Sequence, residues 1–167
     1  MVQALLAAGA NPNGGPNRTP LHPATREIAL KMLPMLLAAK ADPNLPFADQ
    51  SPLFEAALIG EVRAAKMLLA SGAKIELGNN IGITPSIKAA TADHWDMVLF
   101  LIDNGASIWQ AAPNGFTIAT FAEDSRVRRD IPNGKALETV IQRHRDAGYP
   151  WPPPGAPEVK KLIDQGQ

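Results

Sequence analysis

Apolar residues in this chain gather in short runs that recur with a period of roughly 33 residues. Each run is rich in Leu and Ala and closes on Gly or Lys followed by Ala; the runs end at 9–13, 40–44, 72–76 and 105–109. Short apolar runs at helical spacing predict helices that bury one face. A fixed period of such helices indicates a repeat protein, in which each unit buries its apolar face against its neighbours.

A second phrase precedes each run and has the same period. It begins at positions 19, 51, 84 and 117, so successive copies are almost evenly spaced. In the first three copies, the run closes at 40, 72 and 105, always at the same distance from its opener. Three equal internal distances are hard to obtain by chance. The copies are Thr19-Pro20-Leu21-His22, Ser51-Pro52-Leu53-Phe54, Thr84-Pro85-Ser86-Ile87 and Thr117-Ile118-Ala119-Thr120.

The two phrases carry the chemistry of helix ends. The Thr or Ser that begins each of the first three openers can accept a hydrogen bond from a free backbone N–H. The next residue is proline, which suits the first helical position because no N–H is needed there. Gly72 and Gly105 can close the second helix in the left-handed conformation. Lys40 takes that place in one repeat, so we expect a strained or different helix end there. Pro34 falls inside a predicted helix and should bend it.

These features together resemble ankyrin repeats, and the resemblance covers nearly the whole chain. It rests on Thr-Pro-Leu-His at 19–22, on the Gly-Ala phrases and on the period. The best single copy is 79–108, where the matching positions are Gly82, Thr84, Pro85, Ala89, Ala90, His94, Val98, Gly105 and Ala106. The family's unit is a β-turn finger, an antiparallel helix pair and a loop. The resemblance therefore implies an all-α fold, a solenoid of stacked helix pairs with β-turn fingers.

The same resemblance divides the chain. We expect the ankyrin stack to cover 1–149, and a Pro-rich cap with a short helix to cover 150–167. Within the stack we predict a half repeat at 1–13 and repeats at about 14–44, 45–77, 78–110 and 111–149. The half repeat has a second helix but no first helix, so this end of the stack is truncated, frays or pairs with something.

The last repeat is longer than the others. The distance from its opener at Thr117 to its closing Gly148 exceeds the distance in the other repeats, and the extra segment lies near 125–134. We expect its second helix to run from about Lys135 to Ala147. Consecutive prolines keep 150–154 extended, and a short helix should follow from Pro157 to about Asp164. We interpret the tail as a cap over the last apolar face, through Tyr149, Trp151 and Leu162; a proline-rich ligand for a partner domain is the alternative.

Composition removes several classes of function. Hydrophobic residues make up 46% and charged residues 19%, which is typical of a soluble globular chain. The chain has no cysteine, which excludes disulfides and cysteine-bound metals. The formal net charge is zero, so we expect no nucleic-acid partner. No apolar run has the roughly 18 residues of a membrane span. The start of the chain as it stands is not a signal peptide, and removal of one from a longer precursor is the alternative. The compartment stays open between cytoplasm and periplasm.

Catalytic and metal-binding patterns are also missing from the sequence. His22 and His94 stand where the ankyrin pattern itself carries His, which predicts structural hydrogen bonds. His144 lies in a polar helix end and is interpreted as part of a solvated face. Glu123 and Asp124 are adjacent, so they do not face each other on a helix. No phosphate loop, zinc helix or nucleophile elbow occurs. We therefore predict no catalytic residue, no metal and no cofactor, and a protein that is not an enzyme.

The resemblance also implies where a partner would bind, because fingers and inner helices of an ankyrin stack form one concave surface. Several of these positions are apolar here, and aromatic anchors tend to dominate binding energy. Leu58, Ile59 and Ile83 could instead pack between repeats. Pro16 and Arg18 fall on the first finger. The candidate partner-binding residues are Phe47, Gln50, Leu58, Ile59, Asn80, Ile81, Ile83, Phe116, Arg126, Arg128 and Arg129.

The three arginines of the insert form a second candidate surface, because guanidinium groups grip carboxylates well; an exposed loop without a partner is the alternative. Taken together, we expect a non-enzymatic protein-binding module that is a monomer in isolation. The divergent repeats and Pro-rich ending are similar to small bacterial ankyrin proteins, some of which neutralise secreted toxins as immunity partners while others belong to stress responses. The partner would then be a secreted effector. The competing hypothesis is a fragment of a larger ankyrin scaffold.

Overall fold

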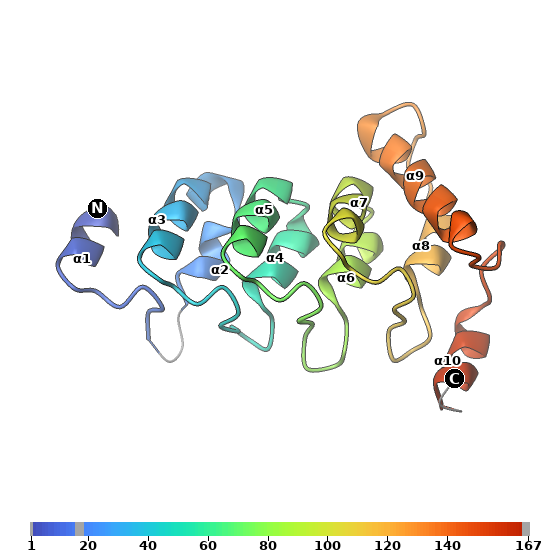
Figure 1. Cartoon of the computed structure of the whole chain (residues 1–167), viewed down its shortest axis with the longest axis horizontal. Coiled ribbons are helices and arrows are strands. Elements are labelled where there is room, and N and C mark those ends of the chain that lie inside the picture. Colours follow the sequence, from blue (N-terminus) through green and yellow to red (C-terminus); the bar gives the residue numbers. More distant parts are fainter. Residues whose placement is uncertain (1, 16–18, 165–167) are drawn as a thin grey trace.

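The computed structural model describes residues 2–15 and 19–164, and its helices stand in one row (Figure 1). The pairs α2 with α3, α4 with α5, α6 with α7, and α8 with α9 follow one another, and the loops between pairs project toward one side. The fold is the all-α solenoid that the sequence predicted. The helices are α1 (Val2–Ala7), α2 (Leu21–Ala24), α3 (Leu33–Ala38), α4 (Pro52–Ile59), α5 (Val62–Ala70), α6 (Pro85–Thr91), α7 (Trp95–Asp103), α8 (Ile118–Asp124), α9 (Pro132–Asp146) and α10 (Ala156–Asp164), with a 3-10 helix η1 (Glu27–Met32).

Hydroxyl side chains start the first helix of the later repeats, as predicted. Ser51 Oγ accepts the N–H of Phe54 at 3.1 Å, and Thr84 Oγ1 accepts the N–H of Ile87 at 3.5 Å. Each bond satisfies one of the free N–H groups at the helix start. The proline that follows then occupies the first turn of the helix without losing a hydrogen bond.

The prediction that Thr19 caps its helix was wrong. Helix α2 begins at Leu21, and no side chain caps it. The hydroxyl of Thr19 instead lies 2.7 Å from Nδ1 of His22. The imidazole of His22 is close enough to compete for this hydroxyl, whereas Ser51 and Thr84 have Phe54 and Ile87 at the equivalent position and no such rival.

The second helices end in the same way throughout the stack. In each, a backbone N–H just past the helix donates to a carbonyl five residues earlier, which is the bond that a left-handed residue permits. Gly72 and Gly105 adopt φ of 90° and 99° there, as predicted. Lys40 adopts φ of 67° in the same place, which confirms strain, because its β-carbon crowds the backbone. The bonds are Ala41 to Leu36, Ala73 to Leu68, Ala106 to Leu101 and Tyr149 to His144.

Pro34 divides the second helix of its repeat into two pieces. The 3-10 helix η1 ends at Met32, and α3 begins one residue before the proline. Pro34 thus lies in the first turn of α3, where its missing N–H leaves no hydrogen bond unmade. The sequence predicted a bent helix that loses one hydrogen bond; the structure instead has a change from 3-10 to α geometry, with the proline at a position that needs no N–H.

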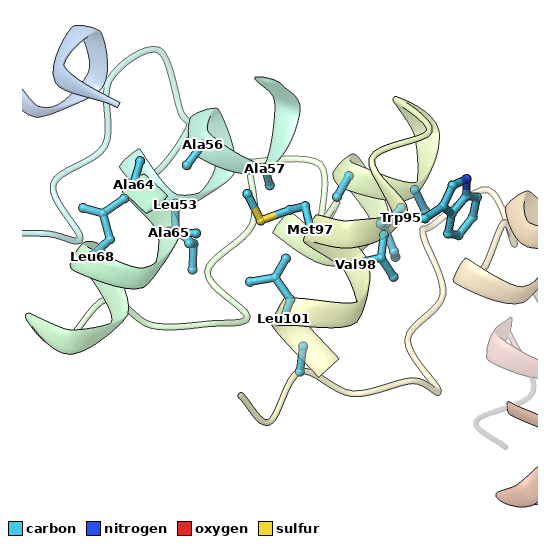
Figure 2. Close-up of a cluster of buried hydrophobic side chains, with 14 of the residues drawn as sticks. Leu53, Ala56, Ala57, Ala64, Ala65, Leu68, Trp95, Met97, Val98 and Leu101 are labelled. Carbon is cyan, nitrogen blue, oxygen red and sulfur yellow. The ribbon is translucent and has the colours of Figure 1, made fainter. Parts of the chain in front are cut away.

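The core lies between successive helix pairs and is built from Leu and Ala (Figure 2). Alanines on α4 and α5, such as Ala57 and Ala64, are fully buried and let neighbouring helices approach closely. Met97 and Leu101 of α7 point toward these alanines, whereas Trp95 points toward the following repeat. Each repeat therefore contributes one face to each of two interfaces, as expected for a solenoid.

Loop side chains join the repeats on the surface. Asn13 Oδ1 accepts the N–H of Asp42, and Asn44 Oδ1 accepts the N–H of Lys74, both at 2.7 Å. Glu76 repeats the contact with the N–H of Ser107, also at 2.7 Å. Because acceptor and donor lie about one repeat apart, each bond fixes the spacing between two units.

This series of hydrogen bonds between repeats ends at the junction of the last repeat with the C-terminal tail, and the sequence shows why. Trp109 takes the acceptor position, and Pro150, which has no N–H, takes the donor position. The Trp109 ring packs instead against the ring of Tyr149, with centroids 5.2 Å apart. An aromatic contact thus replaces the hydrogen bond where the stack meets its tail.

The C-terminal segment differs from its prediction in detail. Helix α9 begins at Pro132 and not near Lys135, because proline starts the helix at its first turn. Beyond it, Arg145 lies over the ring of Trp151, and Val159 of α10 is buried. A β-carbon on Gly115 would lie 1.9 Å from the Ala156 carbonyl, so α10 packs directly on the last finger. Leu162, the third predicted cap residue, has its side chain outside the described residues. That 150–167 acts as a cap stays a prediction.

Helix α1 has no buried residue. Val2 and Leu6 lie partly against the core, while Leu5 is more than half exposed. This is the packing expected of a second helix that lacks its first-helix neighbour.

The interpretation of His144 as part of a solvated face was wrong. Its side chain is fully buried, at the place where the other repeats carry Leu36, Leu68 and Leu101. Nδ1–H donates to the Val140 carbonyl at 2.8 Å, and Tyr149 covers the ring edge-on at 5.5 Å. Nε2 has no partner among the described residues. The sequence around His144 did not predict this burial, because the residue that covers the ring is Tyr149 of the tail.

We expect His144→Leu to stabilise the protein by about 1–2 kcal/mol, since a buried polar atom without a partner carries a cost of that order. Leucine already fills this place in the other repeats, so it should fit without a cavity. Urea unfolding followed by circular dichroism would measure the change. Equal or lower stability would show that the histidine ring makes a contact worth more than the burial of Nε2 costs.

Candidate partner-binding surface

The loops on one side of the stack are hairpin fingers. Asn79 N–H donates to the Ile83 carbonyl at 3.0 Å, and Ala112 N–H donates to the Phe116 carbonyl at 2.8 Å. Each encloses a three-residue turn with a left-handed glycine, Gly82 or Gly115. In the first finger, Pro16 and Arg18 lie outside the described residues.

The finger at 47–50 is built differently. Phe47 and Gln50 exchange both backbone hydrogen bonds across a turn of only two residues. Those two residues, Ala48 and Asp49, adopt φ of 48° and 61°, in the left-handed region that favours glycine. The shorter finger accounts for the slightly closer spacing of the first two openers. Strained backbone that the surrounding structure maintains is typical of functional sites.

An open apolar groove of about 760 Å³ lies beside this finger. Helices α2 and η1 form one wall, and the finger itself forms the other. The Phe47 side chain is 45% exposed, and its ring centroid lies 5.6 Å from that of His22. The apolar lining comes from Pro20, Pro23, Met32, Phe47 and Ala48.

His22 ties the two walls of the groove together. Its Nε2 lies 2.7 Å from the Gln50 carbonyl, which can only accept, so Nε2 carries the proton. Nδ1 then accepts the hydroxyl hydrogen of Thr19. The predicted structural role of His22 is confirmed, and both nitrogens of the neutral ring are satisfied. Burial lowers the pKa of His22 below its ordinary value, although the Gln50 carbonyl and nearby Glu55 partly oppose this.

An ion pair bounds the groove on its polar side. Arg26, the residue before η1, donates to Glu55 of α4 at 2.7 Å. The carboxylate is nearly buried while the guanidinium is largely exposed. Such a pair contributes little stability because solvent screens it, but it orients Arg26 at the mouth of the groove.

Comparison with known proteins decides the family. Ankyrin repeats (3 copies) match residues 30–112. The chain belongs to the ankyrin-repeat family. Ankyrin repeats are protein-interaction modules, and the family is typically non-enzymatic. The chain is also similar to alpha-latrocrustotoxin-Lt1a of Latrodectus tredecimguttatus, with 36% identity over 92 residues. That match covers 54% of this chain and only 6% of the toxin's length.

The other predicted site residues lie on later ankyrin fingers and on an inner helix end. Ile81 is 60% exposed, and Asn80 Nδ2 donates to Asp49 Oδ2 at 3.0 Å, which links two fingers. Phe116 is 36% exposed and stacks on Phe121. Ile83 packs against the core. Leu58 and Ile59, at the end of α4, are half-buried.

The structure thus gathers only part of the predicted set. Phe47 and Gln50 line the groove, whereas the segment between α8 and α9, in which the three arginines occur, lies at the edge of the stack opposite the fingers (Figure 1). The sequence missed Pro23 of α2 and Met32 of η1 as groove residues, because the groove forms only where these two helices pack beside the next finger. Among the described residues, no cluster of metal-ligating side chains occurs, and no helix is both long and apolar enough to cross a membrane.

His94 is structural in the ankyrin stack, but not through the hydrogen bond that was predicted. In the described part of the chain its ring packs against Gly60, where a β-carbon would lie 2.6 Å from Nδ1. Gly60 is left-handed, with φ of 73°, so glycine is required there on both grounds.

We expect the protein to lose stability as the pH falls below about 6.5, in part through His22. The folded-state pKa lies below the ordinary value of 6.5, so the unfolded chain binds the proton first. The contribution of His22 is complete above this pH and is lost below it. Denaturant unfolding at neutral pH and at about pH 5.5 should show a larger loss for the wild type than for His22→Gln. The same loss in both proteins would exclude His22 as its source.

Proposed function

We propose that this chain binds another protein through its finger side, and that the groove beside the finger at 47–50 receives an apolar side chain of the partner. The observation that carries the proposal is the groove itself. Its lining is mainly apolar, its size suits one or two large side chains, and the bond between His22 and Gln50 fixes its two walls relative to each other before any partner arrives.

The neighbouring fingers extend this surface. Phe47, Ile81 and Phe116 expose large apolar side chains on three successive fingers. Exposed aromatic residues around a groove are typical of binding hot spots, since they bury much area at little cost in conformational entropy. Gln50, Asn80, Leu58 and Ile59 would contribute the polar rim and the inner wall of the same surface.

Capture of the partner tests the surface. We expect Phe47→Ala with Phe116→Ala to weaken binding by roughly 10- to 100-fold, the usual effect of removing aromatic anchors. The matched control is Ile28→Ala with Met35→Ala, which also removes two exposed apolar side chains but leaves the fingers intact. Equal affinity of the finger variant and the wild type would remove the fingers as the site. An equal loss of affinity in the control would mean that non-specific hydrophobic contact, and not this surface, binds the partner.

A narrower proposal concerns the partner's identity. We propose a secreted toxin that the chain neutralises, supported by the similarity to small bacterial ankyrin proteins noted above; a fragment of a larger ankyrin scaffold and a stress-response protein are the rival functions. The similarity to a latrocrustotoxin covers only 6% of that toxin's length, so it supports no toxin activity of this chain. Co-expression with the product of a neighbouring toxin gene is the test. Rescue of growth by the wild type but not by the finger variant is expected, and absence of rescue would sink the narrower proposal.

A further inference from the structure

Both ends of the insert in the last repeat are hydrogen-bonded to residues 93–96 of the preceding repeat. At the first end, Ser125 Oγ–H donates to Asp93 Oδ1 at 2.7 Å. Trp95 Nε1–H donates both to Asp93 Oδ1 and to Ser125 Oγ. At the second end, Asn133 Nδ2 donates to the Asp93 carbonyl at 2.8 Å, and Asn133 Oδ1 accepts the N–H of Asp96 at 3.1 Å. The loop between them therefore has a fixed base.

The middle of the loop is also held by packing. Val127 points inward and packs against the core. The Arg128 carbonyl lies so close to Gly134 that a β-carbon there would be 1.8 Å away. These hydrogen bonds and packing contacts together order the loop at 125–131, which would otherwise sample many conformations.

This ordered loop exposes arginines. Arg126, Arg128 and Arg129 are all exposed. Arg128 grips Asp130 with two donors, Nε to Oδ1 at 3.0 Å and Nη2 to Oδ2. Asp130 is therefore occupied, and in the described residues neither Arg126 nor Arg129 has an ion-pair partner. Their charges are left to face solvent from a rigid support.

Charge is also distributed unevenly along the chain. Residues 125–167 hold eight of the sixteen Lys and Arg residues but five of the sixteen acids, which is a formal charge of +3 against −3 for the remainder. A dipolar protein of this kind orients a partner of opposite polarity during encounter.

We propose that the loop at 125–131 is a second docking site, which takes an acidic segment of a protein partner through Arg126 and Arg129. The grip of Arg128 on Asp130 shows in the same loop the paired geometry in which arginine binds a carboxylate. Ile131, which is also exposed, adds an apolar contact beside the charges. Arginine is enriched at protein interfaces.

A protein segment suits this loop better than a nucleic acid. Glu123 and Asp124, both exposed, directly precede the loop, and Asp130 lies within it. A long polyphosphate would meet these acids on either side of the arginines, whereas single carboxylates can pair with one arginine at a time. The inference extends the proposed function to the opposite edge of the stack, but it needs neither the fingers nor the groove.

Binding of labelled oligoglutamate, followed by fluorescence anisotropy at low salt, tests the site. We expect Arg126→Glu with Arg129→Glu to weaken binding by about 10-fold, since it replaces two attractions by repulsions. The control Lys31→Glu with Lys66→Glu changes the net charge equally, at exposed lysines of η1 and α5, and should change affinity less than about twofold. Phe47→Ala with Phe116→Ala should bind oligoglutamate as the wild type does. Circular dichroism of each variant confirms that it folds, and Arg126→Ala with Arg129→Ala replaces the charge reversal if it does not.

Three results would overturn the proposal. The first is no binding of oligoglutamate by the wild type, and the second is an equal loss in the lysine control. The third is tighter binding of an oligothymidylate of equal charge, lost on reversal of the arginines, which would assign the loop to nucleic acid. None of these results bears on capture of a partner by the fingers, so failure here is distinguishable from failure of the proposed function.

Discussion

Trp95→Ala should lower the free energy of unfolding by about 3–5 kcal/mol, the usual cost of removing a large buried aromatic side chain. Trp95 is fully buried at the start of α7 and points toward the last repeat. Its Nε1–H also donates to Asp93 and Ser125, so the substitution removes a fastening of the insert together with the packing. This one side chain serves both the core and the candidate docking loop.

Urea unfolding of Trp95→Ala and of Trp109→Ala measures the difference. Trp109 is 54% exposed and its ring packs on Tyr149, so its replacement should cost about 1 kcal/mol. Trp95→Phe keeps most of the packing but loses the hydrogen bonds, and should fall between the two. Similar losses for both tryptophans would contradict the structural placement of Trp95.

Gly134→Ala should destabilise the protein by about 2 kcal/mol, although it lies in a helix where alanine is favoured by about 1 kcal/mol. The reason is the insert. The new β-carbon would lie 1.8 Å from the Arg128 carbonyl oxygen and 2.8 Å from the Arg129 Cα, and backbone cannot yield as a flexible side chain would. Either the loop or the first turn of α9 must move, and the hydrogen bonds of Ser125 and Asn133 at the two ends of the insert weaken.

Hydrogen exchange reports this movement directly. The Asp96 N–H is bonded to Asn133 at the foot of the loop, so its exchange should accelerate in Gly134→Ala. Gly155→Ala is the matched control, because its nearest neighbour would be an ordinary contact at 3.7 Å. Unchanged stability and unchanged exchange at Asp96 in Gly134→Ala would mean that the loop is not held against the helix.

The surfaces that we propose for binding lie where the chain departs from an otherwise regular repeat. The finger at 47–50 is one residue shorter than the two fingers that follow it, and the groove lies beside it. The insert at 125–134 is found in one repeat, and the exposed arginines lie on it. Regular units supply the scaffold, while the irregular ones supply the surfaces that we propose for binding.

The sequence by itself determined the fold, because its signals are local. Ser51 and Thr84 cap helices through bonds that reach three residues along the chain, and the left-handed residues at 40, 72 and 105 end helices through bonds that reach five. Because these interactions span only a few residues, they recur wherever the two sequence phrases recur. The period of the phrases is therefore enough to predict helix pairs, fingers and a solenoid.

Only the tertiary structure decided which surfaces the solenoid presents. His144 is buried because Tyr149 of the tail covers it, and Thr19 is no helix cap because His22 takes its hydroxyl while also bonding the finger at Gln50. The groove likewise needs α2, η1 and the next finger together, and the insert is fixed by Asp93 from the repeat before. Each of these contacts joins residues that packing, and not sequence distance, brings together, so no local pattern could predict them.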